Sequence, residues 1–284
     1  MLKRIDGYGE RWYFDTQTLR TYLSCTSFCK KVLPESKYLV DWKVKHGEQG
    51  AYEQLQKAAH YGTFMHAVIE EYCKALKYAQ AFAIDPGSPL YAWKEIQDLC
   101  EDYCTEHRIM YLEDRFLKKI RKDILAFAQF AWEKNIEIIN IEQFLSWDIT
   151  DEAGLAGTVD LEVFMDFNRK RVRAIIDMKS GGIWESAELQ LHVYKMMLPE
   201  VDMVFNWSPN DWRLGKKPSY TLKNQTNSTM AAKLPNYIEN GIIDGIFTPK
   251  IKQVDYEVIK YGEEPEYTVL DTEKVLENIL KEES

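Results

Sequence analysis

Two acidic side chains and one lysine occupy positions from which they could share a single cation. Asp160 lies in one β-branched run of the sequence, and Asp177 and Lys179 lie in the next. Side chains alternate between the two faces of a strand, so Asp177 and Lys179 point to the same side, opposite the apolar side chains of their run. The short connection at Asn168-Arg169 favours an antiparallel hairpin between the two runs.

The register of this hairpin follows from its apolar side chains. A slip of one residue would turn one strand inside out, so the two apolar faces must coincide. With the turn at Asn168-Arg169, Leu161 then lies opposite Ile176, and Asp160 lies opposite Asp177. A slip of two residues would keep the faces and make the two aspartates diagonal neighbours. In either register two carboxylates share one side of the hairpin.

Two carboxylates about 5 Å apart repel each other unless a positive group lies between them. Lys179 could supply part of that charge, and a hard divalent cation such as Mg²⁺ or Mn²⁺ would supply more, because it prefers oxygen ligands. The alternative is a salt-bridge cluster on a solvated strand face, which is the usual meaning of so short a motif. The partnering Asp160 favours the metal site.

Two helical segments carry further candidates. His66 follows Gly62-Thr63 and lies at the margin of an apolar stripe, which indicates that it faces inward. Gln190 and Tyr194 are four residues apart and therefore share one face of a later helix. Taken alone, an inward-facing histidine is more often a satisfied core residue than a metal ligand, and Gln190 and Tyr194 are ordinary helix residues.

Two strand residues complete the candidates. Thr158 shares the face of Asp160, and Glu142 on the preceding strand could assist the acidic cluster.

Four elements in order, Gly62-Thr63-x-x-His66, Gly157-Thr158-Val159-Asp160, Asp177-Met178-Lys179 and Gln190-x-x-x-Tyr194, resemble the PD-(D/E)XK nuclease superfamily. Within it, they are similar to the branch of RecB-type, CRISPR-adaptation and phage recombination exonucleases. The resemblance covers residues 62–194, under half of the chain. It implies a restriction-endonuclease-like α/β fold, with a mixed central sheet flanked by helices and an N-terminal helical layer.

The resemblance also implies roles for these residues. Asp160, Asp177, the Met178 carbonyl and His66 would bind one or two Mg²⁺ or Mn²⁺ ions. Lys179 would position or help to deprotonate the attacking water. Gln190 would order the site or contact a phosphate, and Tyr194 would pack beside Lys179. Thr158, within the second element, and Glu142, which lies outside all four elements, are candidates for a supporting or DNA-binding role.

We therefore expect a metal-dependent deoxyribonuclease, specifically an exonuclease acting on linear DNA in recombination, repair or phage DNA processing. A non-catalytic DNA-binding protein of the same fold and a structure-selective endonuclease are the alternatives. A helicase or single-strand annealing partner and a homo-oligomer are left open. Trp207 and Trp212 could stack on bases at the groove, or they could pin a surface loop from inside.

The cysteines raise a second metal question. Some relatives in this branch hold an iron–sulfur cluster with one cysteine before the nuclease core and three after it. Here no cysteine follows Cys104, so we expect no iron–sulfur cluster and free, buried cysteines instead. The sequence also lacks a phosphate-binding G-x-x-x-x-G-K-[ST] loop and a G-x-S-x-G nucleophile motif.

Composition sets the remaining limits. The 284 residues carry 36 Lys and Arg against 45 Asp and Glu, a net charge of −9, which does not exclude a local DNA-binding groove. No apolar run approaches the roughly 18 residues that span a bilayer. The N-terminus lacks the apolar core of a secretory signal, so we expect a cytoplasmic protein without a membrane segment. No linker divides the chain, and we expect one nuclease domain over residues 1–284.

The elements that must position these residues follow from periodicity. Residues 1–135 are expected to be mainly helical, residues 136–210 to form the catalytic sheet, and residues 211–284 to form a helical and strand extension. The expected helices are 63–79, 90–106, 117–134, 185–198, 228–240 and 271–281. The expected strands are 137–145, 157–167, 171–179, 201–207 and a weaker one at 254–261.

Overall fold

In the computed structural model, strands β5 (Gly154–Phe167) and β6 (Lys170–Met178) form the expected hairpin with the expected register. The strands are antiparallel, and Leu161 lies opposite Ile176. Asn168 and Arg169 both have positive φ, 50° and 63°, as a two-residue hairpin turn of this twist requires. The apolar faces therefore fixed the register, as the sequence predicts.

The structure describes residues 2–7, 10–81, 114–151, 153–209, 219–248, 252–254 and 267–269. It divides into two compact units. The central unit comprises Leu33–Leu145 and Thr158–Leu234, and the terminal unit comprises Met1–Val32, Ser146–Gly157 and Pro235–Ser284. All candidate site residues belong to the central unit.

The sheet of the central unit is mixed. Strand β6 pairs antiparallel with β5 and parallel with β7 (Met203–Ser208), and β7 pairs antiparallel with β8 (Thr221–Asn224). Strand β4 (Glu137–Asp148) also pairs with β5. Helix α5 (Glu185–Met197) makes the crossover from β6 to β7 that a parallel pair needs.

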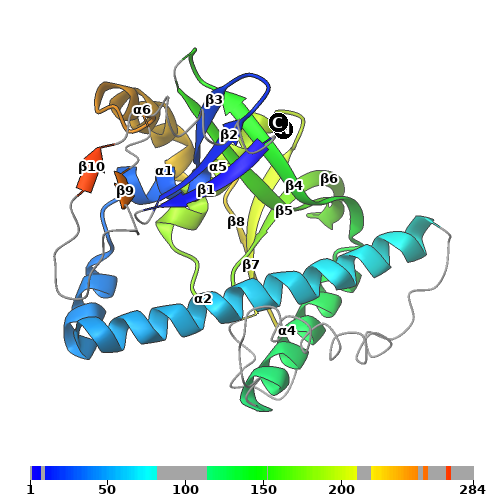
Figure 1. Cartoon of the computed structure of the whole chain (residues 1–284). Helices are drawn as coiled ribbons and strands as arrows, with labels where there is room; N and C mark the ends of the chain where they lie inside the picture. The colour runs from blue at the N-terminus through cyan, green and yellow to red at the C-terminus, as the bar shows by residue number, and fades with distance from the viewer. Residues whose placement is uncertain are drawn as a thin grey trace. The chain divides into compact units, whose positions relative to one another are not determined.

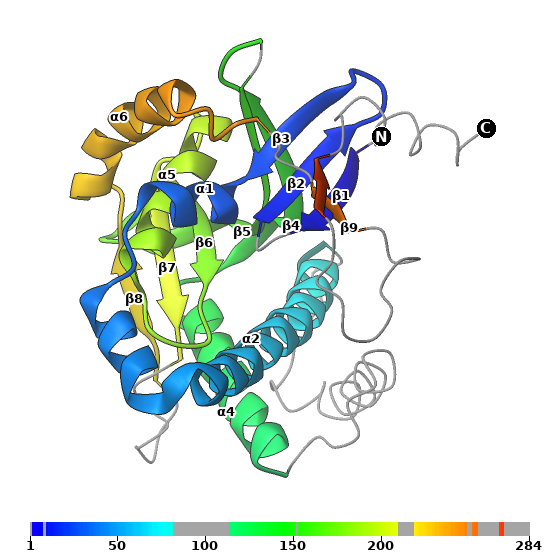
Figure 2. The same ribbon diagram turned by 60° about the vertical axis from the view of Figure 1, so that its left-hand side comes forward.

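Helices α2 (Lys37–Ala81) and α4 (Asp114–Glu133) cross each other and pack against this sheet (Figures 1 and 2). Their apolar stripes form one buried cluster with alternate residues of the strands. The cluster includes Met65, Ile69, Phe127, Phe130, Leu161, Val163, Ile176, Met178, Phe205 and Trp207. Side-chain alternation puts Asp160, Asp177 and Asn206 on the opposite side of their strands.

Helix α2 has a kink at Gly47. Gly47 has φ 70° and ψ 164°, which is outside the helical region and which glycine adopts at little cost. The Ser36 hydroxyl accepts a hydrogen bond from the Leu39 N–H at 3.2 Å and so caps the first part of the helix. The second part carries the stripe expected for residues 63–79.

The terminal unit departs from the sequence-based expectation. Its first described residues are not helical; they form the antiparallel strands β1 (Leu2–Gly7), β2 (Glu10–Asp15) and β3 (Arg20–Ser24). Helix α1 (Cys25–Val32) follows, and β3 pairs parallel with the first residues of β5. The expectation was wrong because strand pairing buries Trp12, Phe14 and Leu23, whose spacing alone does not distinguish a strand from a helix.

Hydrogen bonding through β5 gives one eight-stranded mixed sheet of order β1-β2-β3-β5-β6-β7-β8, with β4 on β5. The fold is therefore the expected mixed α/β sheet flanked by helices. Helix α6 (Thr229–Ile243) is shared by the two units, and the short strands β9 (Lys252–Val254) and β10 (Tyr267–Val269) pair antiparallel.

Some expectations fall outside the described residues. The helices expected at 90–106 and 271–281 lie there, as does most of the strand expected at 254–261. The single-domain arrangement stays a prediction. Within the described part of the chain, no helix combines the length and the apolar character needed to cross a membrane.

Candidate active site

The site lies where the β5–β6 hairpin ends. The ladder runs from the turn to the pair Leu161–Ile176, and the next two residues, Asp160 and Asp177, do not extend it. Instead, the Asp160 Oδ2 atom accepts a hydrogen bond from the Met178 backbone N–H at 2.6 Å. The sequence allowed the two aspartates to be either opposite each other or diagonal neighbours. In the structure both lie just beyond the last ladder pair, Asp160 in the middle of β5 and Asp177 next to the last residue of β6, and Asp160 is bound to the backbone of β6.

Asp177 holds the candidate lysine. The Lys179 Nζ atom lies 2.7 Å from Asp177 Oδ1, in a charge-assisted hydrogen bond. The Lys179 backbone N–H donates to the Trp207 carbonyl at 2.9 Å, which fixes the chain directly after β6. The Asp177 side chain is almost fully buried, whereas that of Lys179 remains 27% exposed, so the ammonium group can reach a substrate.

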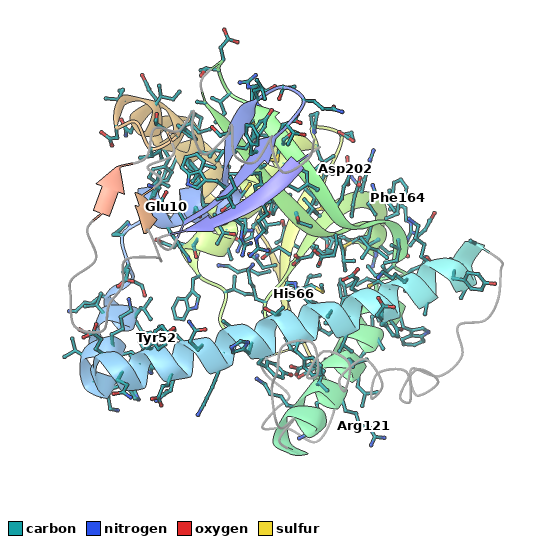
Figure 3. All side chains as sticks on the ribbon, viewed as in Figure 1. Glu10, Tyr52, His66, Arg121, Phe164 and Asp202 are labelled. Atoms are coloured by element: carbon teal, nitrogen blue, oxygen red, sulfur yellow. The ribbon has the colours of Figure 1, made fainter. Side chains whose placement is uncertain are left out.

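His66 reaches the cluster from the middle of α2 (Figure 3). Its Nδ1 atom lies 3.5 Å from Asp160 Oδ1. Gly62, one turn earlier, allows this approach: a Cβ atom at Gly62 would lie 3.2 Å from Ser180 Oγ, tighter than ordinary contact. The small residue therefore lets α2 approach the segment that follows Lys179.

Glu142 is the third donor beside this pair. Single donor atoms of His66, Glu142 and Asp160 all lie within 4.8 Å of one another. The backbone of Glu142 has φ 47°, although the residue lies inside strand β4. Strand alternation alone does not predict that position, which is why the sequence indicated Glu142 only as an assisting residue.

The charges of the cluster shift one another's protonation. Burial lowers the pKa of His66, but the negative charges of Asp160 and Asp177 outweigh that effect and raise it to about 9. Burial and the nearby charge of Asp160 raise the pKa of Glu142 to about 7. Burial alone would raise the pKa of Asp160, yet His66 and Lys179 hold it below its usual value.

Asp177 behaves differently from Asp160. Burial raises its pKa above the usual value, and the nearby Asp160 charge adds to this effect, although Lys179 acts in the opposite direction. The pKa values of the two carboxylates are thus shifted in opposite directions, as happens where buried acidic groups lie close together.

The donor set fits a divalent metal ion. One imidazole nitrogen and two carboxylates are ligands that Mn²⁺ accepts, and the carboxylates suit Mg²⁺. A carboxylate has about four lone-pair sites, so Asp177 keeps acceptor capacity after its two hydrogen bonds, one from Lys179 and one from Asn206. Glu162, the next acid on β5, is instead bound by Arg173 and Asn140.

The other predicted residues lie in the same unit. Gln190 donates to the Tyr194 hydroxyl at 2.9 Å across one turn of α5, which confirms that the two share a helix face. Thr158 is partly buried on β5 near Asp160 in sequence. The Met178 N–H binds Asp160, and a metal-binding role of its carbonyl stays a prediction.

Among the described residues, the tryptophan and the cysteines considered in the sequence analysis lie outside the acidic site. Trp207 is fully buried in the apolar cluster, so it does not stack on bases at a groove; Trp212 lies outside the described residues. Cys25, Cys29 and Cys73 are buried and form no disulfide within the described part of the chain, whereas Cys100 and Cys104 lie outside the described residues.

The sequence missed one polar group at the site. Asn206 on β7 is fully buried and donates to Asp177 at 2.7 Å. The available signal was a single amide residue between Phe205 and Trp207, in the middle of a strand that is otherwise apolar.

Comparison with known proteins adds a family. A search of curated proteins finds no match. Nine chains of solved structures match, one of them described as "Crystal structure of SSO0001", with 12% identity and a TM-score of 0.27, covering 60% of this chain and 70% of the other. A family model described as the PD-(D/E)XK nuclease superfamily matches residues 39–257, a span that contains every candidate site residue. The chain therefore belongs to the PD-(D/E)XK nuclease superfamily.

Proposed function

We propose that the chain is a Mg²⁺- or Mn²⁺-dependent deoxyribonuclease that degrades linear DNA from an end. The observation that carries the proposal is the cluster at the end of the β5–β6 hairpin. In it Lys179 lies 2.7 Å from Asp177, and His66 lies 3.5 Å from Asp160. Membership of a nuclease superfamily supports phosphodiester hydrolysis and a DNA substrate at this cluster.

In this proposal His66, Glu142 and Asp160 bind the metal ion, together with Asp177 and the Met178 carbonyl. A bound divalent cation lowers the pKa of its water ligand and polarises the scissile phosphate. The protein contributes the arrangement of these donors. The hydrogen bond from Met178 N–H fixes one Asp160 oxygen and leaves the other turned toward His66.

Lys179 acts on the reacting phosphate. Its hydrogen bond to Asp177 holds the ammonium group in place before the substrate arrives, so little reorganisation is needed during the reaction. A preorganised positive group of this kind stabilises a transition state by roughly 2.7–4 kcal/mol, or about 10²–10³-fold in rate.

The preference for an exonuclease comes from the motifs. Gly62-Thr63-x-x-His66 and Gln190-x-x-x-Tyr194 are similar to the branch of RecB-type, CRISPR-adaptation and phage recombination exonucleases. The Gln190–Tyr194 hydrogen bond supports this assignment by holding both side chains together on one face of α5.

Digestion of end-labelled linear DNA, single- and double-stranded, beside a closed circle tests the proposal. The wild-type protein should degrade linear DNA with Mg²⁺ or Mn²⁺, stop in chelator and leave the circle intact. Lys179→Ala and Asp160→Asn should each lower the rate at least about 100-fold. Lys223→Ala, an exposed lysine on β8, is the matched control and should keep the wild-type rate.

Each component of the proposal can fail separately. Cleavage of the circle would indicate an endonuclease. Wild-type rates in both site variants would remove the proposed cluster, and activity in chelator would remove the metal. DNA binding without any cleavage would favour the non-catalytic alternative.

A further inference from the structure

Asn206 occupies a position that a core strand normally gives to an apolar residue. It is fully buried on β7, where its neighbours in sequence, Phe205 and Trp207, belong to the apolar cluster of the core. The parallel register of β6 and β7 sets it beside Asp177. Its Nδ2 atom donates to Asp177 Oδ2 at 2.7 Å.

Gln225, just after β8, fixes the orientation of the Asn206 amide. Its Nε2 atom donates to Asn206 Oδ1 at 2.9 Å, so the Asn206 amide group turns its N–H to Asp177 and not its oxygen. Gln225 is itself 2% exposed, and its backbone N–H donates to the Val204 carbonyl at 2.9 Å. The amide chain is therefore anchored to the backbone of β7.

Such a chain is costly to build for stability alone. A buried amide that loses its partner is left with polar atoms that no hydrogen bond satisfies, whereas an apolar residue at the same position carries no such risk. A buried polar network specifies one arrangement only when each member is satisfied. Here Gln225 donates to Asn206, and Asn206 donates to Asp177, so the chain runs in one direction and ends on a site carboxylate.

We infer that Asn206 and Gln225 are positioning residues of the nuclease site, acting through Asp177. This inference rests on the proposed function. Asp177 accepts Lys179 on Oδ1 and Asn206 on Oδ2, so its carboxylate cannot rotate without breaking one of these hydrogen bonds. Asn206 thereby fixes the position of the Lys179 ammonium and the direction of the Asp177 lone pairs that remain for a cation.

The test measures metal binding and catalysis separately in three variants, Asn206→Leu, Gln225→Met and the double variant. Mn²⁺ affinity is measured by calorimetry without DNA, cleavage by kcat on linear DNA, and stability by thermal unfolding. Partners that orient metal ligands typically contribute 10–100-fold to metal affinity or activity. We expect a loss of that size in Mn²⁺ affinity or kcat for Asn206→Leu, and a smaller loss for Gln225→Met.

Thr226→Val is the matched control. Thr226 is the neighbour of Gln225, and its Oγ1 accepts a hydrogen bond from the backbone N–H of the same residue, Val204, at 3.1 Å. Among the described residues, no hydrogen bond joins Thr226 to Asp177 or Asn206. The variant should lower the unfolding temperature to a similar degree while Mn²⁺ affinity and kcat stay at wild-type values. If Asn206 had a purely structural role, Asn206→Leu and Gln225→Met would behave like this control: the unfolding temperature would fall, and Mn²⁺ affinity and kcat would not change.

The double variant decides whether the two amides act in sequence. If Gln225 acts only through Asn206, Gln225→Met has no further effect on kcat or Mn²⁺ affinity once Asn206→Leu is present. Additive losses would overturn the relay. If Asn206→Leu does not fold, the smaller Gln225→Met change carries the test against Thr226→Val.

Failure of the inference is distinguishable from failure of the proposed function. A wild-type protein that binds Mn²⁺ and cleaves DNA, with both properties unchanged in folded Asn206→Leu, overturns the inference alone. A wild-type protein that neither binds Mn²⁺ nor cleaves DNA overturns both.

Discussion

Glu142 shows how the backbone can bring a carboxylate into a site. Among the described non-glycine residues with positive φ, it is the one that lies inside a strand; the others lie in turns. A residue held in this region costs of order 1–3 kcal/mol and persists only where its surroundings fix it. In return, its side chain lies with those of His66 and Asp160.

We expect Glu142→Gln to weaken Mn²⁺ binding at pH 8 by at least about tenfold, or 1.4 kcal/mol, because one negative ligand is lost. At that pH Glu142, with a pKa of about 7, is ionised beside Asp160, so the same change should leave metal-free stability equal or higher. Calorimetry with Mn²⁺ and thermal unfolding in chelator measure the two effects. Glu137→Gln, an exposed acid on the same strand, should change neither the Mn²⁺ affinity nor the metal-free unfolding temperature by as much. Equal Mn²⁺ affinity in both variants would exclude Glu142 as a ligand.

Among single residues, the sequence predicted those whose position depends only on side-chain alternation along a strand. The common face of Asp160, Asp177 and Lys179 follows from that alternation and from the hairpin turn between the two strands. Asn206 was not found, because its role depends on which strand lies beside β6, and a parallel partner cannot be identified from local pattern.

At the scale of elements, the sequence predicted the β5–β6 hairpin, whose contacts are close in sequence, but not the N-terminal strands, whose contacts include residues far along the chain. The β5–β6 register depends on contacts close in sequence, with Asn168-Arg169 as its turn. Strand β3 instead pairs with residues of β5 about 130 positions later, such as Leu23 with Leu155. The consecutive aromatic residues Trp12, Tyr13 and Phe14 are all buried, so they give no alternation that would reveal a strand.

Gly154 at the start of β5 is where this distant packing can be tested. A Cβ atom there would lie 2.5 Å from Tyr22 Cδ1, and Tyr22 is buried. We expect Gly154→Ala to lower the free energy of unfolding by about 1–3 kcal/mol, the usual cost of overpacking. Gly50→Ala on α2 is the same change without a clash, because a Cβ atom there would lie 4.0 Å from its nearest neighbour, His46 Cβ. This variant should be stabilised by about 0.5–1 kcal/mol. Denaturant unfolding of the two variants compares them; a stable Gly154→Ala protein would mean that Tyr22 moves freely.

At the scale of the whole molecule, a net charge of −9 opposes the binding of a polyanion. The candidate site itself contains Asp160, Asp177 and Glu142 against Lys179 and His66, so it does not supply a positive surface without a cation. Screening limits the general repulsion to about 8–10 Å at physiological ionic strength. Close contacts between cationic groups and individual phosphates can therefore outweigh it.

The sign of the salt dependence distinguishes these two contributions. If local phosphate contacts dominate, DNA affinity falls with salt, with a logarithmic slope of about −0.9 per phosphate contact on duplex and −0.7 on single strands. If general repulsion dominates, added salt screens it and affinity rises. We expect a negative slope for the Lys179→Ala protein with Mg²⁺, measured by fluorescence anisotropy between about 50 and 200 mM salt, a range over which such contacts weaken binding strongly. A flat or rising curve would contradict a phosphate-binding groove, because no counterions would then be released when the strand binds.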